Sequence, residues 1–151
     1  MLRLGLELTK ACPVRSDIAF DALFGRHRLR ENLTCGQTER ISYYHCDNRP
    51  GGQIEVQADT ATKPFYFRGE FVRIVRPNIV VLLCTFRKNW RPTYRVQINF
   101  EPMRDESQIR VSCDDTGLDA RDLREFWKTR LDYLVRQMPN TTPRASKPIP
   151  V

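Results

Sequence analysis

The sequence is short of the residues that most often build metal and catalytic sites. Its only histidines are His27 and His45, and its five cysteines contain no CxxC pair. A zinc site needs ligands at short, regular spacings, and a Cys–His or Ser–His–Asp arrangement needs a recognisable motif around the histidine. Neither pattern is present, so the sequence predicts no metal, no cofactor and no visible catalytic constellation.

Long apolar runs are also missing. No stretch approaches the ~20 consecutive apolar residues of a membrane-spanning helix. The first ten residues alternate between apolar and polar types, whereas a signal peptide has a continuous apolar core. An odd number of cysteines fits a reducing compartment better than a disulfide framework. We therefore expect a cytoplasmic protein without a membrane segment.

The positive charge of the chain is not concentrated in one place. The net charge is +7, which permits contact with acidic partners. However, the basic residues are spread along the chain, and the one local cluster is Arg26, Arg28 and Arg30. No nucleic-acid-binding motif accompanies that cluster. We therefore expect no specific binding of nucleic acids.

The element with the clearest boundaries is a helix predicted over residues 119–138. Gly117 precedes it, Asp119 is placed to cap its first turn, and Pro139 follows it. Its apolar residues recur at spacings of three and four, which places them on one face of a helix. They are Leu123, Phe126, Trp127, Leu131, Leu134, Val135 and Met138. A stripe this broad has to pack against another element.

The residues before this helix read mainly as strands. Apolar and polar residues alternate through residues 1–9, and a short helix is predicted over residues 16–24, capped by Ser16 or Asp17. Residues 26–40 have no sustained period and indicate a loop or an irregular second helix. Six further strands are predicted over residues 41–46, 53–58, 65–75, 79–86, 94–101 and 108–113.

These elements predict an α+β fold. A seven-stranded, curved antiparallel sheet wraps around the long C-terminal helix, with short helices after the first strand. We expect one domain over residues 1–138 and a Pro-rich, disordered tail over residues 139–151. The strand over residues 79–86 is almost continuously apolar, so either it is buried on both faces or its outer face meets a partner.

Three phrases, in this order along the chain, resemble one superfamily. They are DNRPGGQIEVQ at residues 47–57, FRGEFVRIVRPNIVVLLCTF at residues 67–86 and REFWKTRLDYLVRQM at residues 124–138. They are similar to the SRPBCC (START-like, helix-grip) superfamily and, within it, to the branch of activator of Hsp90 ATPase homologues (AHSA1-like). The resemblance covers roughly residues 2–138.

The resemblance implies a helix-grip fold with a pocket between sheet and helix, which in many relatives holds an apolar or aromatic ligand. Relatives commonly carry a tryptophan shortly after the first helix, whereas this chain has GRHRLRENLTCGQTER at residues 25–40. That difference leaves the pocket entrance undefined. Because the same fold hosts binders, cyclases and protein-interaction modules, the resemblance alone does not select a function.

The candidate ligand-binding residues are those expected on the inner faces of the sheet and the helix. They are Tyr44, Phe67, Val96, Ile98, Phe126, Trp127 and Arg130. Phe126 and Trp127 have core packing as their alternative role. Arg130 lies three residues after Trp127, so its stem belongs to the inward stripe. It then pairs with a carboxylate such as Glu70, binds an acidic or carbonyl-bearing ligand, or extends to solvent at the edge of the stripe.

Three functions remain open at this point. The first is binding of a hydrophobic or aromatic small molecule between sheet and helix, without a cofactor or metal. The second, implied by the resemblance alone, is a co-chaperone-like module that docks on an Hsp90-type ATPase through an exposed apolar patch; a homodimer is another arrangement. The third is an enzyme of the polyketide cyclase or dehydratase kind, for which only His45, Tyr44 and Glu70 are acid–base candidates.

Overall fold

The computed structural model describes residues 5–25, 28–59, 64–85, 93–114 and 120–138. Its elements follow in the order β1 (Leu6–Cys12), α1 (Ser16–Phe24), α2 (Arg28–Leu33), the 3-10 helix η1 (Thr38–Arg40), β2 (Ile41–Cys46), β3 (Gln53–Asp59), β4 (Pro64–Val75), β5 (Ile79–Thr85), β6 (Tyr94–Met103), β7 (Glu106–Cys113) and α3 (Ala120–Arg136).

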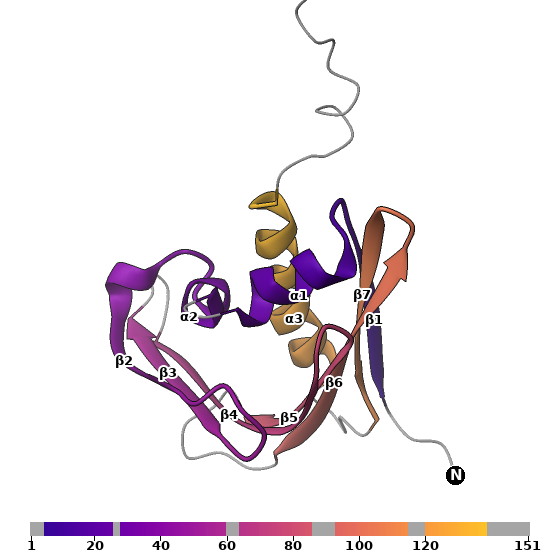
Figure 1. The fold of residues 1–151 in the computed structure, drawn as a ribbon. Coiled ribbons are helices and arrows are strands. Elements are labelled where there is room, and N and C mark those ends of the chain that lie inside the picture. Colours follow the sequence, from indigo (N-terminus) through magenta and orange to yellow (C-terminus); the bar gives the residue numbers. More distant parts are fainter. Residues whose placement is uncertain (1–4, 26–27, 60–63, 86–92, 115–119, 139–151) are drawn as a thin grey trace, which may run out of the picture.

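All of these strands form one seven-stranded antiparallel sheet in the order β1-β7-β6-β5-β4-β3-β2. Strands β2 to β7 pair with their neighbours in the chain, and β1 joins the sheet through β7, with Leu6 opposite Cys113. The sheet curves around α3, and α1 and α2 lie on the same concave side (Figure 1). The predicted α+β fold, with a curved antiparallel sheet around the C-terminal helix, is confirmed.

The core forms where alternating side chains of the strands meet the helices. In β6, Val96, Ile98 and Phe100 face inward and are at most 1% exposed, while Gln97 and Asn99 between them are half-buried on the outer face. Each large apolar side chain buried in this way contributes about 1.5–3 kcal/mol to stability. The facing residues of α3 are Leu123, Phe126, Trp127, Leu131 and Leu134. The apolar stripe predicted for this helix is therefore the one it buries.

Helix α1 covers the sheet at β6 and β7. Its two phenylalanines, Phe20 and Phe24, pack against Phe100 with ring centroids 5.1 and 6.0 Å away. Both pairs have the edge-to-face geometry that aromatic rings favour. Aromatic rings therefore occupy the interior beneath α1.

Strand β5 lies in the middle of the sheet and is buried mainly on one face. Val80, Leu82 and Cys84 belong to the core. On the outer face, Val81 is 1% exposed, but Ile79 and Leu83 are only half-buried. The strand is therefore not fully buried on both faces, since its inner face is core and its outer face is partly open.

The turn between β2 and β3 ties together α1 and β4. Gly51 has a φ of +84°, a left-handed conformation that glycine adopts without steric cost. Its N–H donates to the carbonyl of Phe71 at 2.7 Å, and the N–H of Phe71 donates to the carbonyl of Gly52 at 2.9 Å. The side-chain amide of Asn48 donates to the carbonyl of Phe24 at 2.6 Å. The turn DNRPGG at residues 47–52 therefore holds the end of α1 against the sheet.

Several details of the prediction can be compared with the structure. Strand β1 continues beyond residue 9 to Cys12, because residues 10–12 still pair with β7. Helix α1 has Arg15 at its N-cap without a side-chain cap hydrogen bond, so the capping role predicted for Ser16 or Asp17 is wrong. Residues 26–40 contain α2 and η1, so the second-helix interpretation is correct. The proposed cap at Asp119 and the proposed tail at 139–151 lie outside the described residues.

Candidate ligand-binding site

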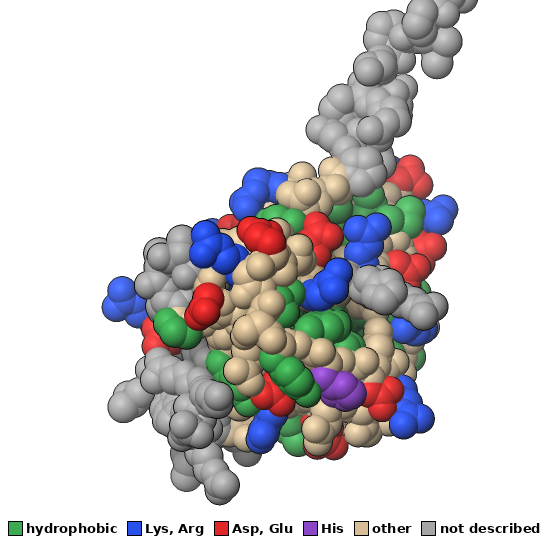
Figure 2. All heavy atoms as spheres, turned by 90° about the vertical axis from the view of Figure 1, so that its left-hand side faces the viewer, with side chains coloured by type: hydrophobic (Ala, Val, Ile, Leu, Met, Phe, Trp, Pro, Cys, Tyr) green, Lys and Arg blue, Asp and Glu red, His purple; other side chains and the backbone are tan. Residues whose placement is uncertain are grey.

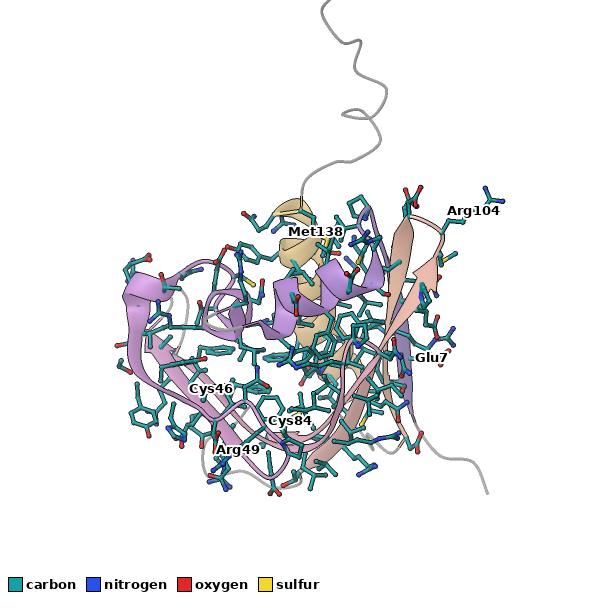
Figure 3. The ribbon with its side chains drawn as sticks, in the orientation of Figure 1. Glu7, Cys46, Arg49, Cys84, Arg104 and Met138 are labelled. Carbon is teal, nitrogen blue, oxygen red and sulfur yellow. The ribbon has the colours of Figure 1, made fainter. Side chains whose placement is uncertain are left out.

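A small cavity lies in the interior between the sheet, the two short helices and α3. Side chains from the sheet and from the helices meet in this space (Figure 3). The cavity is lined by Leu23 and Phe24 of α1, Leu29, Asn32 and Leu33 of α2, Ile54, Phe67, Phe71 and Leu82 of the sheet, and Trp127 and Arg130 of α3. It leaves about 10 Å³ for the centre of a water-sized sphere, which is about the room that one water needs. The protein's own side chains therefore nearly fill the site.

Trp127 lines this cavity and carries a buried polar atom without a hydrogen-bond partner among the described residues. The residue is 3% exposed, and its ring stands perpendicular to those of Phe67 and Phe126, with centroids 6.3 and 5.2 Å away. Its indole Nε1 is buried and has no hydrogen-bond partner among the described residues. Leaving a buried donor unpaired costs about 1–3 kcal/mol. The indole N–H is therefore an unpaired donor in the interior, on a residue that lines the cavity.

Arg130 lies one turn further along α3 and joins α3 to α2. Its Nε donates to the carbonyl of Leu33 at 3.1 Å, and its Nη1 donates to the carbonyl of Phe126 at 3.3 Å. The guanidinium also lies over two aromatic rings, 4.1 Å from the centroid of Phe126 and 5.0 Å from that of Phe65. Such contacts stabilise a cation by about 0.5–2 kcal/mol each. Arg130 thus holds the last residue of α2 over the cavity.

The charge of Arg130 is not neutralised by a nearby carboxylate. Among the described residues, no carboxylate oxygen lies within 4.0 Å of its guanidinium. The predicted alternative of a pair with Glu70 is wrong, because Glu70 is exposed on the outer face of β4. Burial lowers the pKa of Arg130, and burial raises the pKa of the neighbouring Cys35 thiol. Cys35 is therefore neutral at pH 7 and supplies no counter-charge.

The structure distributes the seven sequence-predicted site residues over different parts of the interior. Phe67, Trp127 and Arg130 line the cavity. Phe126 packs beside it, stacked on Phe67 with centroids 5.6 Å apart. Val96 and Ile98 are fully buried in the core but do not line the cavity. The inward direction of these side chains was predictable, whereas their distance from the cavity was not.

Tyr44, the remaining candidate, lies on the edge strand β2. It is half-buried, packs against the core, and has the guanidinium of Arg30 6.0 Å from its ring centroid. It does not line the cavity. On this face of the molecule, hydrophobic side chains are visible between Lys, Arg, Asp and Glu side chains of both signs (Figure 2). Tyr44 therefore belongs to the surface beside the site.

Helix α2 supplies three of the eight lining residues that the sequence analysis did not name; the others belong to α1 and the sheet. Leu29, Asn32 and Leu33 all line the cavity and are at most 5% exposed. Their spacing of three and four is helical, but the segment has only six residues, and two of them are arginines. The periodic signal was present and too short to be distinguished from a polar loop.

The acid–base candidates do not converge on the cavity. His45 and Glu70 are exposed. Burial raises the pKa of Tyr44, so this pKa lies even further above neutral pH than that of a free tyrosine.

In the described part of the chain, no three His, Cys, Asp or Glu side chains are grouped so that they could hold a metal ion. Nor is any helix within these ranges long and apolar enough to cross a membrane.

A larger groove of about 550 Å³ lies between α1, α2 and the C-terminal end of α3. Its walls include the charged residues Asp21, Arg28, Glu31 and Arg76. Because this groove is open and charged, it does not exclude water from an apolar molecule. The interior cavity is therefore the better candidate for a binding site.

Comparison with known proteins places the chain in a family. The model of the family described as Activator of Hsp90 ATPase homolog 1-like protein matches residues 19–138. The chain belongs to this family. No curated protein matches it in sequence. The AHSA1-like branch to which the sequence phrases are similar is therefore confirmed. The matched region begins within α1 and extends to residue 138, just after α3.

Solved structures share the fold at low sequence identity. CalU16 from Micromonospora echinospora has a TM-score of 0.67 and 15% identity, with 93% of this chain and 78% of that chain covered. DynU16, from the dynemicin biosynthetic locus, has a TM-score of 0.67 and 13% identity, with coverage of 87% and 46%. Mll3558 from Rhizobium loti has a TM-score of 0.72 and 15% identity, with coverage of 89% and 96%. At these identities the likeness shows an SRPBCC-type fold.

Proposed function

We propose that this protein binds a small, largely apolar molecule between the sheet and α3, at the interior cavity. The observation that supports this most is a mainly apolar interior cavity beside Trp127, whose buried indole N–H has no partner among the described residues. Buried hydrogen-bond donors in proteins normally have an acceptor. An acceptor on a bound molecule would satisfy this donor, and burial of its apolar surface, at ~25 cal/mol per Å², would supply the affinity.

Binding requires the site to enlarge, because the present cavity holds about one water. Helix α2 is the element that can move at the least cost. It has six residues, and helices this short have little stability of their own. Its links to α3 are the hydrogen bond from Arg130 to Leu33 and one from the Tyr133 hydroxyl to Glu31 Oε2 at 2.8 Å. Displacing Leu29 and Leu33 opens the interior without breaking the sheet.

A thermal-shift screen with apolar, aromatic and polyketide-like compounds tests this proposal. A compound present at 100 times its Kd adds about 2.7 kcal/mol of stability, which raises Tm by several degrees in a domain of this size. Trp127→Phe should reduce the shift for compounds that carry an acceptor oxygen and leave it unchanged for hydrocarbons.

Met103→Ala is the matched control for that screen. Met103 is 54% exposed at the distant end of β6, so its removal should leave every shift as in the wild type. If no compound stabilises the wild type, the binding proposal is wrong.

A second candidate function is docking on an Hsp90-type ATPase. It is supported by the family and by an aliphatic patch on the outer face of the sheet. Val72 and Val75 of β4 are 37% and 36% exposed, beside the half-buried Ile79 and Leu83 of β5. Exposed apolar groups that lie together often mark protein contacts.

Substitution within this patch tests the docking function. Val75→Glu should weaken the interaction with a purified Hsp90-type ATPase by about fivefold or more, as expected when a contact residue at the centre of an interface is replaced. The measurement is a pull-down together with the ATPase rate of the partner. Met103→Glu, which also adds a charge at an exposed apolar position, should have no effect. Equal binding by the wild type and Val75→Glu would exclude this patch.

A further inference from the structure

The two short helices separate the interior cavity from the surface groove of about 550 Å³. Both helices lie on the concave side of the sheet (Figure 1). In each of them, consecutive residues line the two different spaces. In α1, Ala22 lines the groove and Leu23 lines the cavity, and in α2, Arg28 lines the groove and Leu29 lines the cavity. At this place a single layer of helix therefore stands between the cavity and the outside.

Asn32 of α2 lines both spaces, and it is the only described residue that does so. Its side chain is buried, with 4% of the residue exposed, and its Nδ2 donates to the carbonyl of Ala22 at 2.8 Å. Ala22 lies in the last turn of α1, where backbone carbonyls have no partner within the helix. We call this contact between Asn32 and Ala22 the seam. One side chain and one hydrogen bond thus close the wall where the cavity and the groove adjoin.

A second surface groove, between β1 and α3, offers no comparable route. Its volume is about 420 Å³, and none of its described lining residues also lines the cavity. Leu131 lines this groove and is only 1% exposed, as part of the hydrophobic core. A molecule entering there would have to displace core side chains between α3 and the sheet. At the seam it would have to break one hydrogen bond, whose net contribution to stability is small.

We infer that the seam between α1 and α2 is the entrance to the interior cavity, and that the side chain of Asn32 is its gate. This inference rests on the proposed binding function. A molecule passes from the groove into the cavity when the amide of Asn32 releases the carbonyl of Ala22. An entrance changes how fast a molecule enters and leaves, because it alters the barrier between the free and the bound state. It does not change the affinity, because neither of these two states is altered.

Narrowing the groove side of the seam tests the entrance. The probe is N-phenyl-1-naphthylamine, an uncharged aromatic molecule that fluoresces more strongly in apolar surroundings, mixed with the full chain in a stopped-flow instrument at pH 7.5. Ala22→Trp adds a large side chain to the wall of the groove. It should slow both association and dissociation about tenfold and keep Kd within about twofold of the wild type, as expected when only access is restricted.

Thr9→Trp is the matched control, because it places the same side chain in the second groove. Thr9 is exposed on β1, so both rates should stay as in the wild type. If Ala22→Trp fails to fold, Ile18→Trp takes its place. Ile18 is 43% exposed and lines the same groove, and its replacement should slow both rates by a smaller factor.

Quenching of Trp127 by acrylamide tests the gate without any ligand. Trp127 lines the cavity, and in a Trp90→Phe background it is the only tryptophan of the chain. In that background, Asn32→Ala should raise the Stern–Volmer constant about threefold or more, because the quencher reaches the cavity through the open seam. Thr34→Ala is the control for a loosened α2. Thr34 is buried, its Oγ1 donates to the carbonyl of Arg30 at 2.8 Å, and it lines neither space. Its loss should leave the quenching unchanged.

The possible results separate the entrance from the binding function. Probe binding with unchanged rates in Ala22→Trp overturns the entrance and leaves the binding function intact. A changed Kd with an unchanged association rate makes Ala22 part of the binding site and likewise overturns the entrance. Equal quenching in Asn32→Ala and Thr34→Ala overturns the role of Asn32 as the gate. If the wild type binds neither this probe nor any compound of the thermal-shift screen, the binding function is wrong, and the acrylamide measurement still decides whether the seam opens.

Discussion

Phe67→Ala should lower the free energy of unfolding by about 3–5 kcal/mol. Phe67 is 1% exposed and packs against two aromatic residues of α3, with ring centroids 5.6 Å from Phe126 and 6.3 Å from Trp127. Removing its ring leaves a cavity where the sheet meets α3. Since small domains are stable by only about 5–15 kcal/mol, this loss is a large share of the total. Urea denaturation followed by far-UV circular dichroism measures it.

The matched control is Phe65→Ala, two positions earlier on the same face of β4. Phe65 also stacks on Phe126, with centroids 6.1 Å apart, but it is only half-buried. The loss there should be below about 1.5 kcal/mol, since the new space is filled by solvent. Equal losses at the two positions would show that contact with Phe126, and not burial of Phe67 in the core, determines the stability.

Leu33→Ala should have two opposite effects. It should destabilise the fold by about 2–4 kcal/mol, because Leu33 is 3% exposed. It should also raise the affinity for naphthalene about tenfold or more, because part of the space is already present and less free energy is needed to open the site. Apolar cavities made by substitution in other protein cores likewise bind small aromatic molecules. The affinity is measured by calorimetry at a temperature where the variant remains folded.

Leu6→Ala separates the two effects of that substitution. Leu6 is as buried as Leu33, at 4% exposure, but belongs to β1 and does not line the cavity. This variant should lose similar stability and bind naphthalene as the wild type does. If Leu33→Ala and Leu6→Ala bind naphthalene equally, the probe does not enter the cavity beneath α2.

Residue patterns along the chain were sufficient to predict the main elements. The alternation in β6 and the apolar stripe of α3 are strong signals because each repeats over many residues. An element that buries one face along its whole length has apolar residues at regular spacings in the sequence. Helix α2 escaped confident prediction for the opposite reason. Six residues carry little periodic signal, and tertiary contacts hold them, among them the hydrogen bond from Arg130 to Leu33.

The position of the candidate site was not predictable in the same way. Val96 and Ile98 point inward as Phe67 does, yet they do not line the cavity, whereas Phe67 does. Which inward residues meet at the cavity depends on the curvature of the sheet and on which helix covers each strand. Those are relations between segments far apart in the chain, and a single sequence does not record them.

The sequence by itself determined the fold class, the family and the inward direction of Trp127 and Arg130, because these follow from local periodicity and from short phrases in a fixed order. Only the tertiary structure decided what these two residues encounter there. It places backbone carbonyls and aromatic rings around Arg130, and within the described residues it leaves the indole N–H of Trp127 without a partner. Hydrogen bonding and charge compensation depend on distances of a few ångströms between separate elements, and packing alone sets those distances.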